Sequence, residues 1–285
     1  MTGLGNRKEE VTGDNREFTM SYANFVNIRE IAYRLTGITL SDHKQNMIYG
    51  RLARRLRILG LASFDEYCQL LAEDSFEQHE FINAITTNLT AFFREKHHFD
   101  FLKETAFPNI VRKNAASKRL RIWSAGCSTG EEPYSIAMTL SATAGFNQWD
   151  AKVLATDLDT NVVEKGRQGI YQENRCADIP SEYARYLKRN ASTGEIKIRE
   201  DVQEKIAFKQ LNLLHQWPMK GPFDIIFCRN VVIYFDQETQ KKLFARYHEM
   251  LANDGYLFIG HSENLNRVSN DFISLGKTMY QKKSS

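Results

Sequence analysis

The chain has 285 residues, a length typical of one large domain or two smaller ones. Hydrophobic residues make up 42% and charged residues 26%, which excludes wholesale disorder, a collagen-like chain and a coiled-coil rod. Lysine and arginine number 38 against 35 acidic residues, a net charge of +3, so the composition does not favour a general nucleic-acid binder.

The cysteines and the apolar runs indicate the cellular setting. The four cysteines lie far apart without a C-x-x-C pair, which argues against a zinc site or a disulfide framework and suits a reducing cytosol. No apolar run approaches the ~20 residues needed to cross a bilayer. We therefore predict a cytoplasmic protein that binds no metal and is not inserted in the membrane. Residues 1–18 lack the apolar core of a secretory signal, and we predict a disordered tail there.

Residues 19–90 carry the three- and four-residue apolar spacing of amphipathic helices. Gly37 is expected to end the first helix, and the Ser41–Asp42 pair to begin the second, because both side chains cap helix N-termini well. No segment has the pattern of a strand. We predict a small all-α domain with helices over residues 24–36, 41–60, 64–71 and 77–86.

Residues 91–285 alternate, from about residue 118, between short apolar runs and amphipathic segments. The runs are rich in β-branched and aromatic residues without polar alternation, as in a parallel sheet covered on both faces. A polar stretch over about 174–205 contains a hairpin signal at 190–194, and we expect an inserted antiparallel β-subdomain there. The prediction is a doubly wound, mostly parallel α/β sheet. Its expected strands are 120–125, 152–156, 206–211, 224–228 and 256–260, its helices 131–144, 161–168 and 237–251, and a hairpin at 272–282 closes it.

The turn after the first strand, 124–133 (SAGCSTGEEP), has glycines that let backbone approach a ligand. Glu131 and Glu132 follow at the start of a helix, where a dinucleotide would place its pyrophosphate. They would repel that anion, so a nicotinamide-dependent oxidoreductase ranks last. The same carboxylates suit a cationic ligand, although they could simply complement the helix dipole.

Polar residues follow the other strands. Asp157 is placed to accept hydrogen bonds from ribose hydroxyls, whereas Asp159 or Thr160 better explains the N-cap of the next helix. Asn212 could serve an adenine amino group, and Leu213 could pack on the ring. The remaining polar candidates follow the 224–228 strand: Arg229, Asn230 and Tyr234.

S-adenosylmethionine combines an adenosine, a cationic sulfonium and an amino-acid tail, and it fits this set of residues. Glu132 would take its α-ammonium group, and aromatic faces would surround the sulfonium. The 88–95 stretch (NLTAFFRE), which joins the two regions, is unusually polar for a plain linker beside two phenylalanines.

Five motifs give the sequence a specific resemblance. They are NLTAFFRE (88–95), STGEEPYSIA (128–137), ATDLDT (155–160), FDIIFCRNVVIYF (223–235) and DGYLFIGHSENL (254–265). The chain from about residue 20 onward resembles the chemotaxis receptor methyltransferase family, CheR. The resemblance implies a receptor-recognition domain at 19–90 and a seven-stranded class I methyltransferase domain at 91–285.

By this resemblance, the protein methylates glutamate side chains on cytoplasmic helices of chemoreceptors, producing glutamyl methyl esters and S-adenosylhomocysteine. The resemblance also implies the cofactor-binding residues: Asn88, Thr90, Arg94, Glu132, Asp157, Asn212, Leu213, Arg229 and Asn230. A glutamate with a reference pKa of ~4.3 is already ionised at neutral pH, so no general base is required. Arg94 and Tyr234 are the candidates for orienting the acceptor carboxylate, and thus the candidate catalytic residues.

Receptor recognition has a separate signal. Residues 44–57 contain five basic side chains and no acidic one, and residues 65–80 contain six acidic side chains and no lysine or arginine. The basic run is either a solvated helix face or a docking surface for acidic receptor helices. The candidate receptor-binding residues are Lys44, Arg51, Arg54, Arg55 and Arg57. The 174–205 insertion resembles the family's β-subdomain, which in some members binds a receptor C-terminal peptide.

Two alternatives remain open. One is a methyltransferase that acts on an amine or a nucleic acid, but the near-neutral charge and the lack of an Asn-Pro-Pro-Tyr motif disfavour it. The other is a cofactor-binding sensor or scaffold without turnover.

Overall fold

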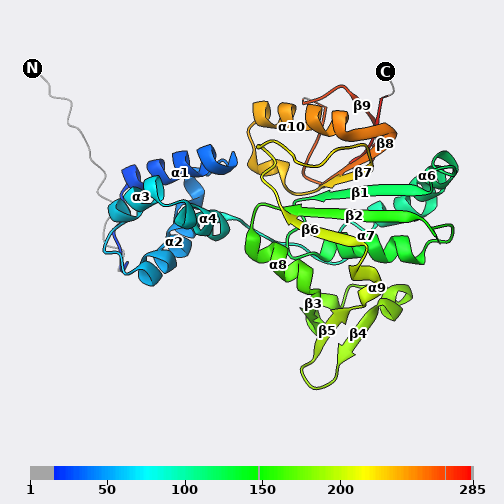
Figure 1. Ribbon diagram of the computed structural model, residues 1–285. Coiled ribbons are helices and arrows are strands. Elements are labelled where there is room, and N and C mark those ends of the chain that lie inside the picture. Colours follow the sequence, from blue (N-terminus) through cyan, green and yellow to red (C-terminus); the bar gives the residue numbers. More distant parts are fainter. Residues whose placement is uncertain (1–15, 147, 267, 284–285) are drawn as a thin grey trace, which may run out of the picture.

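The computed structural model describes residues 16–146, 148–266 and 268–283. Figure 1 shows a helical N-terminal domain beside a larger α/β domain, with a small β unit projecting from the latter. Most of the predicted 1–18 tail lies outside the described residues. Its last residues contact the helical domain, where Glu17 pairs with Arg57 and the Phe18 N–H donates to the Tyr49 hydroxyl.

The N-terminal domain contains the four predicted helices with shifted ends. These are α1 (Tyr22–Thr36), α2 (Gln45–Leu59), α3 (Phe64–Glu73) and α4 (Ser75–Ile85). Gly37 ends α1 in the left-handed region, at φ 72°, as its lack of a Cβ allows. A 3₁₀ turn (Asp42–Lys44) precedes α2, and the Ser41 side chain makes no capping bond there. Within the described chain, no strand precedes Arg119.

A helical stretch that the sequence analysis left unassigned follows the linker between the domains. It comprises α5 (His97–Phe101), a π-helical turn (Leu102–Ala106) and α6 (Phe107–Lys113). Each piece is too short to show a full amphipathic period. Phe99 stacks on Phe227 with ring centroids 6.2 Å apart, so this stretch covers one face of the sheet.

The large domain is built on a seven-stranded sheet of order β6-β2-β1-β7-β8-β10-β9. The first five strands are parallel, and β10 is antiparallel to both β8 and β9, which confirms the predicted mostly parallel fold with a closing hairpin. The strands are β1 (Arg119–Ala125), β2 (Asp150–Asp157), β6 (Ile206–Gln210), β7 (Phe223–Cys228), β8 (Leu251–Ile259), β9 (Phe272–Gly276) and β10 (Met279–Lys282).

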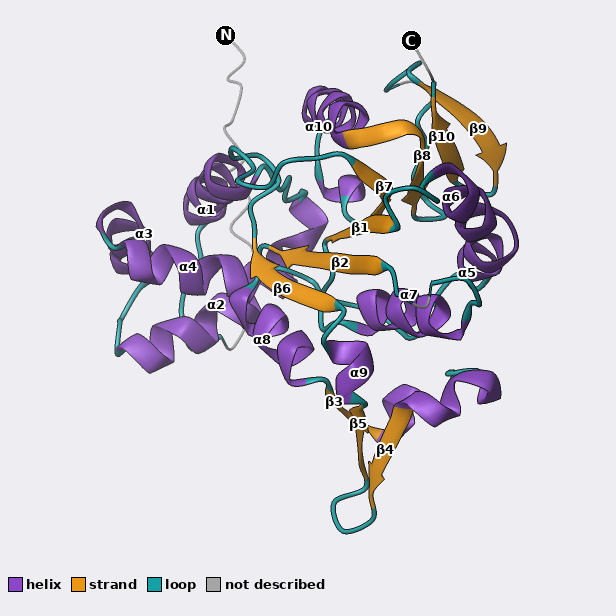
Figure 2. Cartoon of the chain, turned by 45° about the vertical axis from the view of Figure 1, so that its right-hand side comes forward, coloured by secondary structure: helices purple, strands orange, loops and turns teal. Residues whose placement is uncertain are grey.

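Helices cover both faces of this sheet (Figure 2). α7 (Glu131–Ala142) and α8 (Thr160–Gln168) share one hydrophobic core with α5 and α6, and α10 (Gln237–Met250) packs into a second core on the other face. None of the helices in the described ranges has the length and apolarity needed to cross a lipid bilayer.

The predicted insertion is a three-stranded antiparallel sheet of order β3-β5-β4. It begins slightly earlier than expected, with β3 (Ile170–Gln172), β4 (Leu187–Asn190) and β5 (Glu195–Ile198), and α9 (Glu200–Gln203) leads back to the main sheet. Tyr171 and Tyr183 are buried in the same core as α7, so the base of the insertion packs against the main domain.

Candidate active site

A pocket that is partly open to solvent lies where the carboxyl ends of the parallel strands meet the N-terminal domain. The strand-end turns form its floor. Ile38, Leu40 and Lys44, from the segment between α1 and α2, form part of its wall. A largely apolar cleft at a domain boundary and at the carboxyl edge of a parallel sheet is typical of a small-molecule site.

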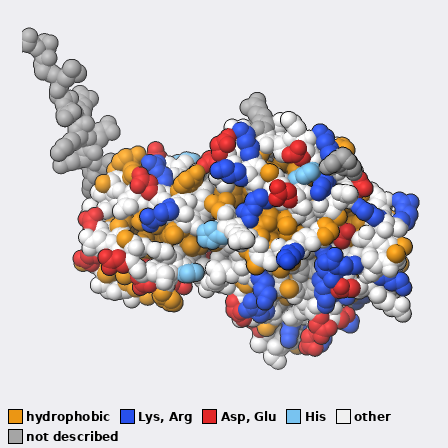
Figure 3. Space-filling model, turned by 45° about the horizontal axis from the view of Figure 1, so that its top comes forward, with side chains coloured by type: hydrophobic (Ala, Val, Ile, Leu, Met, Phe, Trp, Pro, Cys, Tyr) orange, Lys and Arg blue, Asp and Glu red, His pale blue; other side chains and the backbone are white. Residues whose placement is uncertain are grey.

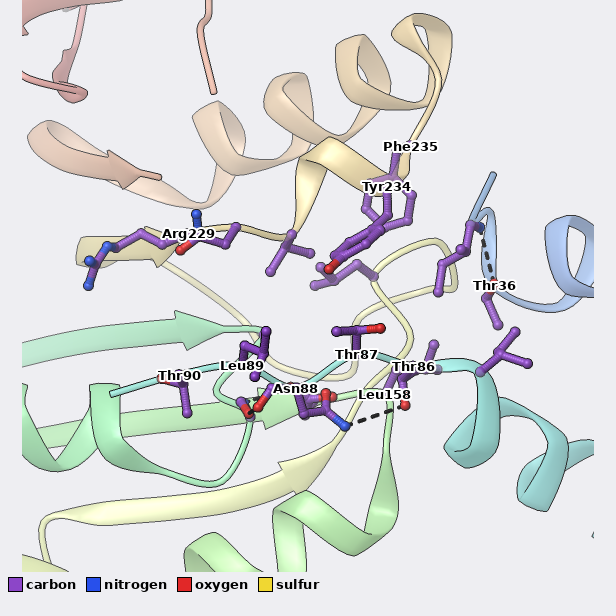
Figure 4. A pocket seen from close by; sticks show the side chains of 18 of the residues that line it. Thr36, Thr86, Thr87, Asn88, Leu89, Thr90, Leu158, Arg229, Tyr234 and Phe235 are labelled. Atoms are coloured by element: carbon purple, nitrogen blue, oxygen red, sulfur yellow. Dashed lines mark hydrogen bonds between the residues drawn. The ribbon is translucent and has the colours of Figure 1, made fainter. Parts of the chain in front are cut away.

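The segment between α4 and α5 crosses the pocket and contributes residues 85–91 and Arg94 to its lining (Figure 4). Hydrogen bonds hold it against the sheet domain. The Asn88 side chain donates to Asp159 at 2.7 Å. The backbone carbonyl of Asn88 accepts from the Ser128 hydroxyl at 3.1 Å. Arg94 donates to the Leu89 carbonyl at 3.0 Å, which ties both ends of the loop together.

The two glutamates after Gly130 have different surroundings. Glu131 is fully buried, accepts from Thr129 and pairs with Arg175, whose guanidinium also donates to the Thr90 carbonyl. Glu132 lines the pocket, accepting from Ser124 at 2.7 Å and from Arg229 at 3.1 Å. Burial raises the pKa of Glu132, and the Arg229 charge opposes that rise.

Asp157 is placed at the end of β2 with its carboxylate in the pocket lining. One oxygen accepts from the Ser128 N–H at 2.8 Å and the other from the Asp159 N–H at 3.0 Å. Burial raises the pKa of Asp157 to about 6, against the opposing effect of these N–H groups. The neighbouring Asp159 caps α8, as the sequence indicated, and also accepts from Thr86.

Asn212 and Leu213 lie together after β6 in the pocket lining. The Asn212 amide donates to the Leu35 carbonyl at 2.9 Å and accepts from the Leu214 N–H at 3.0 Å, so it joins the sheet edge to the end of α1. Leu213 is only 8% exposed. Its apolar side chain forms part of the pocket wall.

Arg229 lies at the centre of a buried charge cluster that sequence reasoning only partly anticipated. Its guanidinium contacts Glu132 and, at 3.5 Å, Glu95, and it donates to the Arg94 carbonyl. Two carboxylates thus share one guanidinium. Glu95 also accepts from the backbone and the ring of His261, at 3.2 and 3.1 Å. Glu95 was not among the predicted residues, because the two partners that place it at the pocket, Arg229 and His261, are more than 130 positions away.

Glu95 also belongs to the one group of side chains in the described ranges with the spacing of metal ligands, with His97 and His98. The ring Nε2 atoms of both histidines lie against the Lys277 carbonyl, at 3.2 and 3.1 Å. Burial, together with the Arg229 charge, lowers the pKa of His98 to about 3. The absence of a metal stays a prediction.

Asn230 begins the turn after β7, in the left-handed region at φ 60°, and lines the pocket with Val231. Packing is close here, since a Cβ on Gly126 would lie 2.3 Å from a Val231 methyl carbon. The turn is held by Glu263, a buried residue that the sequence analysis did not single out. The sequence signal that could have identified Glu263 is its position, four residues after the end of the apolar strand β8.

Tyr234 and Lys44 meet across the domain boundary. The Lys44 ammonium lies 5.1 Å from the centre of the Tyr234 ring, and both residues line the pocket. Figure 4 shows Tyr234 facing the 86–90 segment, with its hydroxyl directed into the pocket. The Tyr234 carbonyl accepts from the Thr39 N–H at 2.9 Å, which fixes the helical domain to this wall.

The basic run on α2 is divided between several roles. Arg55 pairs with Glu77 and Glu80, and the Arg55 and Glu77 side chains are 13% and 1% exposed. Arg51 donates to the carbonyls of Ala84, Ile85 and Thr86 at the end of α4. The basic and acidic runs therefore neutralise each other in part, which leaves Arg54 and Arg57 exposed on α2.

The comparisons with known proteins agree with this geometry. Residues 23–86 match the CheR methyltransferase all-alpha domain, and residues 88–281 match the CheR methyltransferase SAM-binding domain. The chain is 46% identical to a chemotaxis protein methyltransferase of Escherichia coli strain K12, over 92% of this chain and 91% of that protein. It is 44% identical to chemotaxis protein methyltransferase 2 of Pseudomonas aeruginosa, over 93% of this chain and 95% of that protein. The chain belongs to the CheR family of S-adenosylmethionine-dependent chemotaxis methyltransferases.

Proposed function

We propose that the protein transfers the methyl group of S-adenosylmethionine to glutamate side chains on cytoplasmic helices of chemoreceptors, forming glutamyl methyl esters. One observation carries the proposal. A single pocket joins Asp157 and Glu132, which suit a cationic cofactor, to Arg94, Lys44 and Tyr234, which suit an anionic acceptor.

The residues present fit the cofactor. Each Asp157 oxygen accepts one backbone N–H and keeps a lone pair for a ribose hydroxyl. Leu213 offers an apolar surface to the adenine, and the Asn212 oxygen has a second lone pair for its amino group. A cofactor α-ammonium group beside Glu132 would offset the free-energy cost of burying the ionised Glu132 carboxylate. The predicted cofactor set is completed by Asn88, Thr90, Arg94, Arg229 and Asn230.

The cofactor, when bound, supplies an electrophilic methyl group on a sulfonium. The protein must then hold an acceptor carboxylate in line with that methyl group and keep water out, and both requirements lower the barrier. Arg94 and Tyr234 are proposed to do so, Arg94 by its positive charge and Tyr234 by its hydroxyl. Proton removal is unnecessary because the acceptor is ionised at neutral pH.

Receptor docking is proposed to use the exposed arginines of α2, Arg54 and Arg57, together with Lys44 at the pocket. The face in Figure 3 shows basic and acidic side chains interspersed rather than a broad basic surface. That distribution supports attraction to a local acidic patch on a protein more than tracking along nucleic acid. We propose that the enzyme works in the cytoplasm without a metal, which agrees with its four buried free cysteines.

Methyl transfer from a labelled cofactor to a purified receptor cytoplasmic fragment tests the proposal. The expected product carries label that is released as methanol by mild alkali, because a carboxylate ester hydrolyses and a methylamine does not. Mass spectrometry is expected to find the label on glutamate. Label that survives alkali, or cofactor binding without any transfer, would overturn the proposed reaction.

A further inference from the structure

The carboxylate of Glu263 is bound by backbone N–H groups of the segment that follows β7. It follows β8 and is 5% exposed. One oxygen accepts from the N–H groups of Val231 and Val232, both at 2.9 Å, and of Ile233 at 3.3 Å. The other accepts from Asn230 at 3.0 Å and Gly260 at 2.6 Å. Five backbone donors therefore converge on one carboxylate.

Four of these donors belong to the turn that forms one wall of the pocket. The N–H groups of four successive residues point the same way, as at a helix N-terminus, and such an arrangement binds an anion. Asn230 adopts a left-handed conformation, which is uncommon for a residue with a side chain. A charge that accepts its N–H offsets the strain of that conformation.

The consequences of this contact extend across the pocket. Two of these donors, Val232 and Ile233, belong to the short 3₁₀ helix Val232–Tyr234, so the position of the Tyr234 ring follows from the position of the bound N–H groups. Val231 packs on Gly126 at the end of β1, and the Tyr234 carbonyl binds Thr39 of the helical domain. A displaced turn would therefore move the wall that faces the cofactor and the wall that faces the acceptor.

We propose that Glu263 is a positioning residue for methyl transfer, which acts through the Asn230–Tyr234 segment by binding its successive N–H groups. The inference rests on the proposed function, because it assigns Tyr234 a place beside the acceptor. Glu263 itself touches neither reactant. A side chain that only stabilised the fold would change the melting temperature and leave the turnover of the folded enzyme intact.

The test compares Glu263→Gln and Glu263→Ala with the wild type at a temperature where circular dichroism shows every variant folded. Gln keeps one oxygen that can accept from one set of N–H groups, although its amide group faces the other set. Because Ala accepts from neither set, Gln is expected to retain more activity than Ala. We expect Glu263→Gln to lower kcat with a receptor fragment at least about tenfold, as displaced reacting groups do. Asn264→Ala is the matched control, because this exposed neighbour accepts from the Asn266 N–H and, among the described residues, makes no bond to the Asn230–Tyr234 segment.

A double-mutant cycle tests whether Glu263 acts through Tyr234. In a Tyr234→Phe background, Glu263→Gln is expected to lower kcat less than about twofold further, since coupled residues are not additive. Losses that multiply, or Glu263→Gln with a lowered melting temperature and wild-type kcat, would overturn the inference. The proposed function fails separately, when the wild type itself gives no alkali-labile product.

Discussion

Protonation of Asp157 is predicted to weaken cofactor binding in mild acid. Burial raises the pKa of this carboxyl to about 6, well above the ordinary aspartate value. The ionised form has lone pairs for two ribose hydroxyls in addition to its two backbone donors, whereas the protonated form loses one acceptor position. Affinity for the cofactor should therefore fall as the pH passes downward through the pKa.

The size of the effect follows from the fraction ionised. With a pKa of about 6, the carboxyl is about 91% ionised at pH 7 and about 9% ionised at pH 5. If only the ionised form binds, the affinity falls about tenfold, or about 1.4 kcal/mol. Titration calorimetry with S-adenosylhomocysteine at both pH values measures this directly.

Loss of binding at pH 5 would not be a sign that Asp157 unfolds the protein. A carboxyl whose pKa is higher in the folded state takes up its proton preferentially when folded. The contribution of Asp157 to the free energy of unfolding therefore rises as the pH drops toward the pKa that the carboxyl has in the unfolded chain. Protonation of Asp157 is therefore expected to raise the stability of the fold and to lower the affinity for the cofactor.

Asp157→Asn is the control for this prediction. The variant has no carboxyl to titrate at this position, so its affinity should be low at pH 7 and should change little at pH 5. A wild-type affinity that is equal at the two pH values would refute the reasoning. An equal slope in the wild type and in Asp157→Asn would assign the titration to another carboxyl, with Glu132 as the first candidate because burial also raises its pKa.

The remaining predictions concern the acceptor side, the helical domain and metals. Arg94→Ala should lower turnover about a hundredfold, as loss of a charge aimed at the reacting groups does, with little change in melting temperature; unchanged turnover would remove Arg94 from the mechanism. Arg54→Glu should raise KM for the receptor fragment at low salt and leave S-adenosylhomocysteine affinity intact, an effect that high salt should abolish. Arg55→Ala should instead lower the free energy of unfolding in urea by about 3 kcal/mol, because it leaves the buried Glu77 carboxylate without its ion partner. A variant as stable as the wild type would show that the buried Arg55–Glu77 pair does not stabilise the helical domain. Incubation with a chelator should leave turnover unchanged, and a loss restored by a divalent ion would point to the Glu95–His97–His98 cluster.

The sheet and most helices could be predicted from the sequence because their signals are local. The apolar run at 224–228 predicts a strand, and Gly37 predicts the end of the first helix, each from a few adjacent residues. The corresponding elements, β7 and α1, are present with starts shifted by a residue or two. The 97–113 stretch could not be found in this way. Its short pieces differ in helical type, and the Phe99 ring that anchors it packs against Phe227, a distant residue.

Charge runs illustrate the same limit for the candidate site. The basic and acidic runs of the N-terminal domain were visible as composition, but the pairing of Arg55 with Glu77 depends on how α2 packs on α4. A count of charges therefore overestimated the basic surface that is available to a receptor. Glu263 shows the converse, because its role depends on backbone donors about 30 residues away that a residue pattern does not display.

The buried cluster around Arg229 explains how one pocket can serve a cation and an anion. Glu95 and Glu132 share a single guanidinium, so the cluster carries excess negative charge when both are ionised. The Arg229 charge counters the burial of Glu95 and holds the pKa of that carboxyl below its usual range, whereas burial raises the pKa of Glu132. A cationic ligand beside Glu132 would favour its ionised form and be favoured by it. The same cluster would repel an acceptor carboxylate, so we predict that the acceptor approaches near Lys44 and Tyr234, which lie together at the domain boundary and line the pocket.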